Sequence, residues 1–284
     1  MIPMAVSEPQ RWALGVEYDG SGFVGWQRQK DGPSVQAAVE QALGFVAGHP
    51  VDLHCAGRTD AGVHATGQVI HFDTTALRDE RNWLLGANAR LPEAVALLWA
   101  RPVSRDFHAR FSAQGRRYRY VIANQAVRPA LQARGVAWWR YPLDAGRMHE
   151  AAQALLGTHD FSSLRAAACQ ARSAIKTVHS IRVHRQGRYV VLDVHANAFL
   201  HHMVRNIAGV LLPIGQGRRD AGWVHEIMNA RDRRASGITA PAGGLYLVGV
   251  DYDPVHRLPG AGQAPTWPVF PQAFGDGSSR QGPG

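Results

Sequence analysis

The residues best suited to chemistry surround Asp60, in the segment Gly57-Arg58-Thr59-Asp60-Ala61-Gly62-Val63-His64. An isolated Asp-Xaa-Gly is most often a turn, because the aspartate bonds its own backbone and the glycine supplies a positive φ. Here glycines on both sides of Asp60 keep side chains away from the backbone and leave room for a ligand. Arg58 lies two residues before the carboxylate and could hold a phosphate or splay a nucleotide. The segment is therefore either a turn or a carboxylate site beside an anion-binding arginine.

A second candidate is the run Arg116-Arg117-Tyr118-Arg119-Tyr120. As a strand it places Arg117 and Arg119 on one face and the two tyrosines on the other. One interpretation is an edge strand with solvated arginines and half-buried tyrosines. The other is an RNA surface, in which arginines bind phosphates and Tyr118 or Tyr120 stacks on a base, a contact that contributes about 1–3 kcal/mol. The pattern alone leaves both interpretations open.

Residues 199–214 have helical spacing and include two adjacent histidines. On such a helix His201 and Arg205, four residues apart, share a face. Neighbouring helical positions diverge, so His201 and His202 are a poor pair for one metal ion. No His-x3-His spacing with a supporting carboxylate occurs in the chain, and we therefore expect no metal site.

Several other kinds of chemistry leave no signature in the chain. It lacks the Gly-x-Ser-x-Gly pattern of a serine nucleophile, and neither Cys55 nor Cys169 lies in a redox motif. No Walker loop occurs, and Gly20-Ser21-Gly22 does not continue into a dinucleotide-binding pattern. What remains is one aspartate flanked by glycines in a basic protein.

The 284 residues carry a formal net charge of +9. Such an excess attracts polyanions without proving that one binds. No apolar run approaches the roughly 20 residues of a membrane span, and the first residues lack the pattern of a secretory signal. Two cysteines fit a reducing environment better than a disulfide framework. We expect a cytoplasmic protein without a membrane partner.

The elements expected from hydrophobic periodicity form two similar series. The first comprises strands at 13–19, 51–56, 67–72 and 95–103, with helices at 35–46, begun by Ser34, and at about 80–89. The second comprises strands at 116–123, 175–183, 189–197 and 245–252, with helices running from Asp144 to Gly157, over 199–214 and near 222–230.

This order predicts an α+β fold of two ferredoxin-like (RRM-like) halves, each a mostly antiparallel sheet with helices on one face. We expect the halves to span residues 11–108, with the candidate carboxylate, and 109–254. Residues 255–284 are rich in proline and glycine, which predicts a largely disordered tail.

At these motifs the sequence resembles the tRNA pseudouridine synthase A family. The resemblance covers roughly residues 11–252, in family order, and the block around Asp60 is its most specific part. The other matching stretches are Glu17–Gly20, Gly25–Gln29, Gly67–Phe72, Asp106–Ser112, Arg116–Tyr120, Asn197–Asn206 and Gly243–Val248.

The resemblance implies that uridine is isomerised to pseudouridine at positions 38, 39 and 40 in the anticodon stem-loop of tRNA. It also implies a homodimer, with one tRNA spanning both subunits, and neither a cofactor nor a catalytic metal. It assigns the following roles: Asp60 as nucleophile, Tyr118 stacked on the target uracil, Arg205 as ion-pair partner of the carboxylate, Leu245 as an apolar wall, Arg58 as a base-flipping or phosphate contact, and His202 as a substrate contact.

These roles agree with the chemistry. A carboxylate can attack and leave again, as breaking and rejoining a glycosidic linkage requires. An enclosed site favours the neutral acid, and a neighbouring guanidinium restores the charged form. The target uridine leaves its stack at a cost of a few kcal/mol, which stacking on Tyr118 offsets in part. Asp60, Tyr118, Arg205 and Leu245 should therefore meet in a central basic cleft between the halves.

Two alternatives predict different behaviour. An RNA-binding or RNA-chaperone protein with two ferredoxin-like halves would explain the charge and the Arg/Tyr strand, and would form no pseudouridine. A metal-dependent RNA hydrolase using Asp60 with His64 or His71 would lose its activity in chelator.

Overall fold

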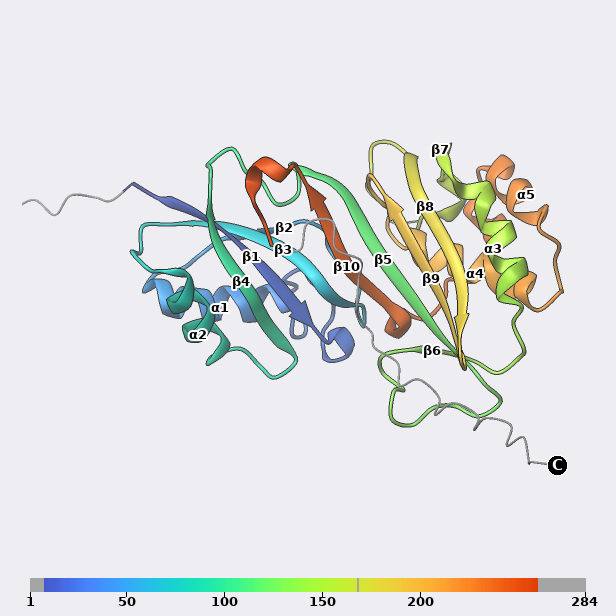
Figure 1. The fold of residues 1–284 in the computed structure, drawn as a ribbon, viewed down its shortest axis with the longest axis horizontal. Helices are drawn as coiled ribbons and strands as arrows, with labels where there is room; N and C mark the ends of the chain where they lie inside the picture. The colour runs from blue at the N-terminus through green and yellow to red at the C-terminus, as the bar shows by residue number, and fades with distance from the viewer. Residues whose placement is uncertain (1–7, 168, 260–284) are drawn as a thin grey trace, which may run out of the picture.

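The computed structural model describes residues 8–167 and 169–259, which form one mixed sheet with helices packed against it (Figure 1). The strands are β1 (Gln10–Tyr18), β2 (Leu53–Cys55), β3 (His64–Thr74), β4 (Val95–Val103), β5 (Ala113–Asn124), β6 (Ala137–Trp139), β7 (Gly157–Asp160), β8 (Ile175–Gln186), β9 (Tyr189–Ala196) and β10 (Leu245–Tyr252). The α-helices are α1 (Val35–Ala47), α2 (Glu80–Asn88), α3 (Ala145–Ala152), α4 (Met203–Gly215) and α5 (Trp223–Ala230).

Helix α1 begins and ends where its sequence predicts. The Ser34 hydroxyl accepts the backbone N–H of Ala37, which satisfies one of the free donors at the helix start. Gly48 ends the helix with φ 75°, the left-handed conformation that glycine adopts without strain. The face that carries Val39 and Leu43 is fully buried against the sheet.

The two halves of the sheet have the same internal order. In the first half the order is β4-β1-β3, with β2 paired to β3, and in the second it is β10-β5-β9-β8. Both correspond to the 4-1-3-2 order of a ferredoxin-like unit, with antiparallel neighbours. The predicted fold class is thus confirmed, whereas the exact division at residue 108 stays a prediction.

A short parallel pairing joins the halves. Tyr246 and Leu247 of β10 lie beside His64 and Ala65 of β3, directly after the segment that holds Asp60. The junction therefore places the start of β10 and the middle of β5 next to the candidate carboxylate.

The helices of both halves cover the same face of the sheet (Figure 1). Alternate side chains on that face, including Leu14, Ile70, Tyr120 and Leu247, belong to one continuous apolar core. A smaller cluster with Val121 lies on the other face of β5. Because Tyr118 and Leu245 share the helical face, the candidate site opens on that side.

The structure differs from expectation in the second half. The α-helical part of α3 ends at Ala152 and continues as a 3-10 turn over Gln153–Leu155, and Gly157 opens the unexpected strand β7 with φ 90°. The short strand β6 was also not expected. Helix α4 begins at Met203, four residues later than its apolar spacing predicts.

The expected tail lies mostly outside the described residues. Its first part is described: Pro254–His256 form a 3-10 turn, and the Leu258 side chain is buried. Residues 260–284 lie outside the described residues. Within the described residues, none of the helices combines the length and apolar character needed to cross a membrane.

Candidate active site

The segment that carries Asp60 is anchored to the end of β1 and the loop after it. The backbone N–H of Trp26 donates to the Thr59 carbonyl at 3.0 Å, and the Thr59 hydroxyl bonds the hydroxyl of Tyr18 at 2.8 Å. Gly25 and Asp60 form an isolated antiparallel bridge. The backbone of Asp60 is therefore held from one side by buried groups.

A buried glutamine holds the other end of the segment. The Gln68 side chain, fully buried in β3, donates to the Gly57 carbonyl at 2.6 Å and accepts its N–H at 3.4 Å. Gly62 has φ 76°, so the backbone after Asp60 forms the turn that one interpretation of the sequence predicts. The segment is thus a turn whose backbone is held in place, and this fixes the positions of Arg58 and Asp60.

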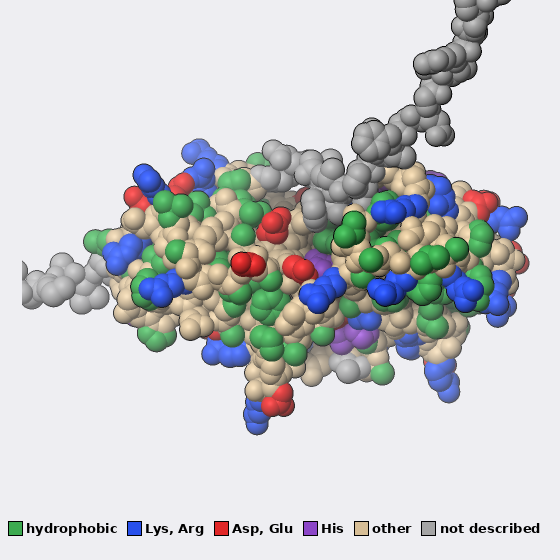
Figure 2. Space-filling model, turned by 90° about the horizontal axis from the view of Figure 1, so that it is seen from below, with side chains coloured by type: hydrophobic (Ala, Val, Ile, Leu, Met, Phe, Trp, Pro, Cys, Tyr) green, Lys and Arg blue, Asp and Glu red, His purple; other side chains and the backbone are tan. Residues whose placement is uncertain are grey.

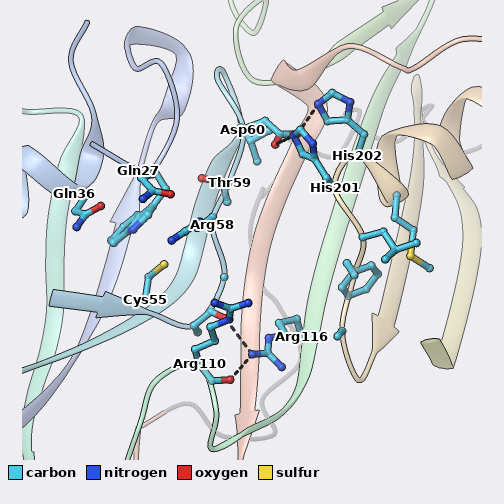
Figure 3. Close-up of a pocket in the computed structure, with 18 of the residues that line it drawn as sticks. Gln27, Gln36, Cys55, Arg58, Thr59, Asp60, Arg110, Arg116, His201 and His202 are labelled. Atoms are coloured by element: carbon cyan, nitrogen blue, oxygen red, sulfur yellow. Dashed lines mark hydrogen bonds and ion pairs between the residues drawn. The ribbon is translucent and has the colours of Figure 1, made fainter. Parts of the chain in front are cut away.

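Three cationic or hydrogen-bonding side chains surround the Asp60 carboxylate, and Figure 3 shows two of them, His201 and His202. Nε2 of His201 lies 3.0 Å from Oδ1, whereas Nε2 of His202 and Nη1 of Arg205 each lie 3.3 Å from Oδ2. The carboxylate is 23% exposed. It remains reachable from the cleft while its oxygens are fixed in orientation.

The prediction that the adjacent histidines diverge is wrong. It assumed that both residues lie on a helix, but α4 begins only at Met203. His202 has φ 63° and caps the helix in a left-handed conformation, which turns both rings to the same side. The ring centroids lie 4.1 Å apart, and both Nε2 atoms reach Asp60. A positive φ for a histidine is uncommon, and such strain clusters at functional sites.

Arg205 is oriented by more than the carboxylate. Its Nε donates to the Ala240 carbonyl at 2.8 Å, and its side chain is 15% exposed. His202 and Arg205 both belong to the N-terminal end of α4, where the helix dipole favours a nearby negative charge. The predicted pairing of Arg205 with Asp60 is present in the structure, while its catalytic role stays a prediction.

Tyr118 and Leu245 line the same cleft as Asp60. Burial, together with the negative charge of Asp60, raises the pKa of the Tyr118 phenol, which is therefore neutral. A side-chain carbon placed on Gly57 would lie 3.6 Å from the Tyr118 hydroxyl, so the ring lies beside the segment that holds Asp60. Leu245, buried at the start of β10, pairs with Tyr120 across the strands.

The arginines of β5 do not form the phosphate-binding surface that one reading of the strand predicts. Arg117 pairs with Asp251 and Arg119 with Asp193, on the sheet face opposite Tyr118. Arg116 lies on the cleft side, but its guanidinium donates to backbone carbonyls, including that of Ala56 at 3.0 Å and that of Arg110 at 2.7 Å. These arginines stabilise the sheet and its loops.

Other arginines are available to an anion. In the described part of the chain, the guanidinium groups of Arg58 and Arg110 form no ion pair or hydrogen bond, and both line the cleft of about 1130 Å³ that contains Asp60. Figure 2 shows lysine and arginine side chains over both ends of one face of the molecule, with histidines near its middle. The positive charge is therefore spread widely, and two unpaired guanidinium groups lie in the cleft itself.

Two groups of side chains have the spacing of metal ligands among the described residues. The first is Asp60 with His201 and His202. A dication there would lie close to the guanidinium of Arg205, which repels it. Neither His64 nor His71 belongs to this group, so the pairing that the hydrolase alternative requires is absent from the described residues.

The second group is His54, His71 and His108. Nδ1 of His71 accepts the backbone N–H of Ala109, and Nδ1 of His108 accepts that of Arg110. Nδ1 of each ring is thus occupied, and the ring proton of each neutral imidazole must lie on Nε2. Metal-binding histidines usually have the opposite arrangement, in which the second nitrogen donates. This cluster is a structural anchor rather than a ligand set.

Burial and the neighbouring His108 lower the pKa of His71 to about 3. In the unfolded chain the ring takes up a proton near pH 6.5. The stability that a neutral His71 provides is therefore complete above pH 6.5 and is lost as the pH falls toward 3. Over this range the free energy of unfolding of the wild type falls as the pH is lowered. We expect this fall to be smaller in His71→Asn, by up to about 1.4 kcal/mol per pH unit.

Urea titrations at a series of pH values measure this difference. The matched control is His225→Gln, which removes an exposed imidazole and should leave the wild-type slope. Equal slopes for wild type and His71→Asn would contradict the assignment.

Cys55 is a poor competing nucleophile in the cleft. Cys55 lines it close to Arg58, but burial raises the pKa of its thiol to about 12. The reactive thiolate is therefore scarce at neutral pH. Asp60 remains the nucleophile that the geometry favours.

The fold and site define a protein of two ferredoxin-like halves with a carboxylate in a cleft lined by arginines. A family model described as "tRNA pseudouridine synthase" matches residues 15–112 and 151–253. The proteins named "tRNA pseudouridine synthase A" from Pseudomonas aeruginosa and Tolumonas auensis are 56% and 55% identical to this chain. These alignments cover 91% of this chain and 93% of the first protein, and 90% of this chain and 98% of the second. The chain belongs to the tRNA pseudouridine synthase family.

Among solved structures, a chain of the "Crystal Structure of a Cbf5-Nop10-Gar1 Complex" is 13% identical, with a TM-score of 0.35. The match covers 83% of this chain and 48% of that chain. This similarity is too low to carry an argument about the site.

Proposed function

We propose that this protein isomerises uridine to pseudouridine at positions 38, 39 and 40 of the tRNA anticodon stem-loop, with Asp60 as the nucleophile. The observation that carries the proposal is the Asp60 carboxylate, held by Arg205 and two histidines in a cleft with unpaired arginines, in a member of this family. The names of the relatives support tRNA as the substrate.

The chemistry needs no group from outside the chain. Asp60 attacks the ribose or the uracil ring, the bond from N1 to the sugar breaks, and the detached base turns. The sugar then bonds to C5 of the base, and the bond to Asp60 breaks, which regenerates the carboxylate. C5 loses its proton, while N1 gains one. Pseudouridine has the same composition as uridine, because one proton is lost at C5 and one is gained at N1, so no oxidant, reductant or co-substrate is consumed.

The surrounding residues have separate roles in this proposal. Arg205 orients the carboxylate by a hydrogen bond to Oδ2, and His202 also fixes Oδ2 beside the bound substrate. Tyr118 is a neutral ring on which the target uracil stacks, with Leu245 as the apolar wall beside it. Arg58, which has no ion-pair partner among the described residues, contacts a phosphate or occupies the space that the flipped uridine leaves.

The test uses three unmodified tRNA transcripts, each with uridine at only one of positions 38, 39 and 40, and a fourth with none. We expect chemical adduct mapping to find pseudouridine at the single uridine of each of the first three and none in the fourth. Pseudouridine formed outside these positions, or at none of them, would contradict the substrate assignment. An RNA-binding protein without catalysis would bind all four transcripts and change none.

We further propose that the protein is a cytoplasmic homodimer and that one tRNA spans both subunits. The two cysteines, which form no disulfide, are consistent with a reducing compartment. Sedimentation of the purified protein, alone and with one tRNA per dimer, tests the assembly. A monomer that binds one tRNA by itself would contradict it.

A further inference from the structure

A tight turn at residues 108–112 lines the end of the cleft away from Asp60. Figure 3 shows Arg110 at the opposite end of the drawn pocket from Asp60 and its histidines. Nδ1 of His108 accepts the backbone N–H of Arg110 at 3.1 Å and that of Phe111 at 3.3 Å. The His108 imidazole therefore stabilises the turn by binding two of its backbone N–H groups.

Side chains from three strands also form hydrogen bonds to the backbone of this turn. His71 of β3 accepts the N–H of Ala109 at 3.1 Å, and the Tyr252 hydroxyl of β10 donates to the Ala109 carbonyl at 2.6 Å. Arg116 of β5 donates to the Arg110 carbonyl at 2.7 Å. Backbone groups on both sides of the tip are thus bonded to rigid elements, and the turn has little freedom to move.

The side chain at the tip is an exposed phenylalanine. Phe111 is 75% exposed, although a phenylalanine ring is ordinarily buried for its large apolar area. Its ring lies 4.3 Å from that of His108 with a tilt of 38°, and it lines the cleft. A rigid turn that presents an aromatic ring to a cleft is a preformed stacking surface.

The charges nearby suit a nucleotide. The Arg110 guanidinium lies 5.5 Å from the centre of the Phe111 ring, and Arg58 lies between this turn and Asp60 (Figure 3). Both guanidinium groups are without an ion-pair partner among the described residues. Asp52 is the one acidic residue besides Asp60 that lines the cleft in the described part of the chain. Aromatic rings next to free cations are what single-stranded nucleic acid requires of a protein.

We propose that Phe111 forms a second nucleotide subsite, on which an unstacked base of the tRNA lies while Arg110 and Arg58 bind the connecting phosphates. The subsite rests on the proposed function, because its ligand is the strand that carries the target uridine. It contributes to tRNA binding and leaves the chemical step at Asp60 unchanged. Phe111 is a substrate-binding residue in this account, and His108 positions it.

The test compares Phe111→Ala, Phe111→Leu and Phe111→Trp with wild type, by filter binding of unmodified tRNA at fixed salt and by pseudouridine formation at saturating tRNA. We expect the Ala variant to raise the Kd about 5- to 150-fold, the range that loss of one base–aromatic stack gives. The Leu variant should behave like Ala, because an aliphatic chain has no π-face, and the Trp variant should bind like wild type. The saturated rate should stay at the wild-type value in all three.

Phe45→Ala is the matched control. Phe45 is 61% exposed on α1, with the Arg90 guanidinium 3.8 Å from its ring centre, and it does not line the cleft. Its loss should leave the Kd unchanged. A Phe111→Ala variant that binds like Phe45→Ala, or a Leu variant that binds like wild type, would overturn the proposal. A failure of the proposed function itself is distinguishable, because wild type would then form no pseudouridine.

Discussion

Asp60→Asn should abolish pseudouridine formation while tRNA binding survives. The carboxamide has nearly the shape of the carboxylate but cannot act as an anionic nucleophile, and removing a nucleophile typically lowers kcat by about 10⁴- to 10⁶-fold. The backbone of the segment is held by Thr59, Gly57 and their partners in β1 and β3, so the cleft should keep its form. Single-turnover conversion and filter binding of the same unmodified tRNA measure the two effects separately.

Asp52→Asn is the control for this substitution. Asp52 also lines the cleft, and its side chain is exposed. The same change of charge at that position should leave kcat near the wild-type value. An Asp60→Asn variant with a normal rate would show that the nucleophile lies elsewhere.

Arg205→Met should have the second largest effect. It removes a guanidinium that lies 3.3 Å from Oδ2 of Asp60, in a site where both side chains are less than one quarter exposed. A hydrogen bond to a charged group contributes about 1.5–3 kcal/mol, so kcat should fall about 10- to 150-fold. Initial rates at saturating tRNA measure the change.

Arg117→Met is the control for Arg205→Met, because it removes an ion pair that does not involve Asp60. Arg117 pairs with Asp251 at 3.0 Å, but it lies on the sheet face opposite Tyr118. Its replacement should leave the rate at saturating tRNA unchanged. An equal fall in both variants would mean that Arg205 acts through stability and not through the carboxylate.

The fold was predictable because its signals are local and repeated. Alternating apolar residues mark the strands, and Ser34 and Gly48 mark the ends of α1. The order of elements then restricts each half to a ferredoxin-like unit. The start of α4 was not predictable from periodicity, because the residues before Met203 continue the apolar spacing while His202 takes a left-handed conformation.

Part of the site was predictable from motifs, and part depends on contacts between distant segments. Arg205 and Asp60 are 145 residues apart and meet only because β3 and β10 join the halves. No local pattern indicates that Gln68 holds Gly57, since a lone glutamine in a strand is unremarkable. His201 was also missed as a partner of Asp60, because an error of four residues in a helix start changes where a side chain points.

For the arginines, by contrast, a sequence pattern was present but its interpretation as phosphate contacts did not hold. Arg117 and Arg119 have the sequence pattern of phosphate contacts, yet acidic side chains of neighbouring strands neutralise them. Arg110 stands outside that pattern, and its guanidinium lies in the cleft without an ion-pair partner among the described residues. Whether an arginine is available to RNA depends on its ion-pair partners in the folded protein. The sequence of a single strand does not show these partners.

Groups of this chain alone should convert uridine to pseudouridine. The most direct measurement is a single turnover of unmodified tRNA by excess purified protein, in chelator and without any added small molecule, followed by mapping of pseudouridine. The structure predicts full conversion in the anticodon stem-loop at the same rate with and without chelator. No conversion, or conversion that appears only when a metal ion is restored, would contradict the account.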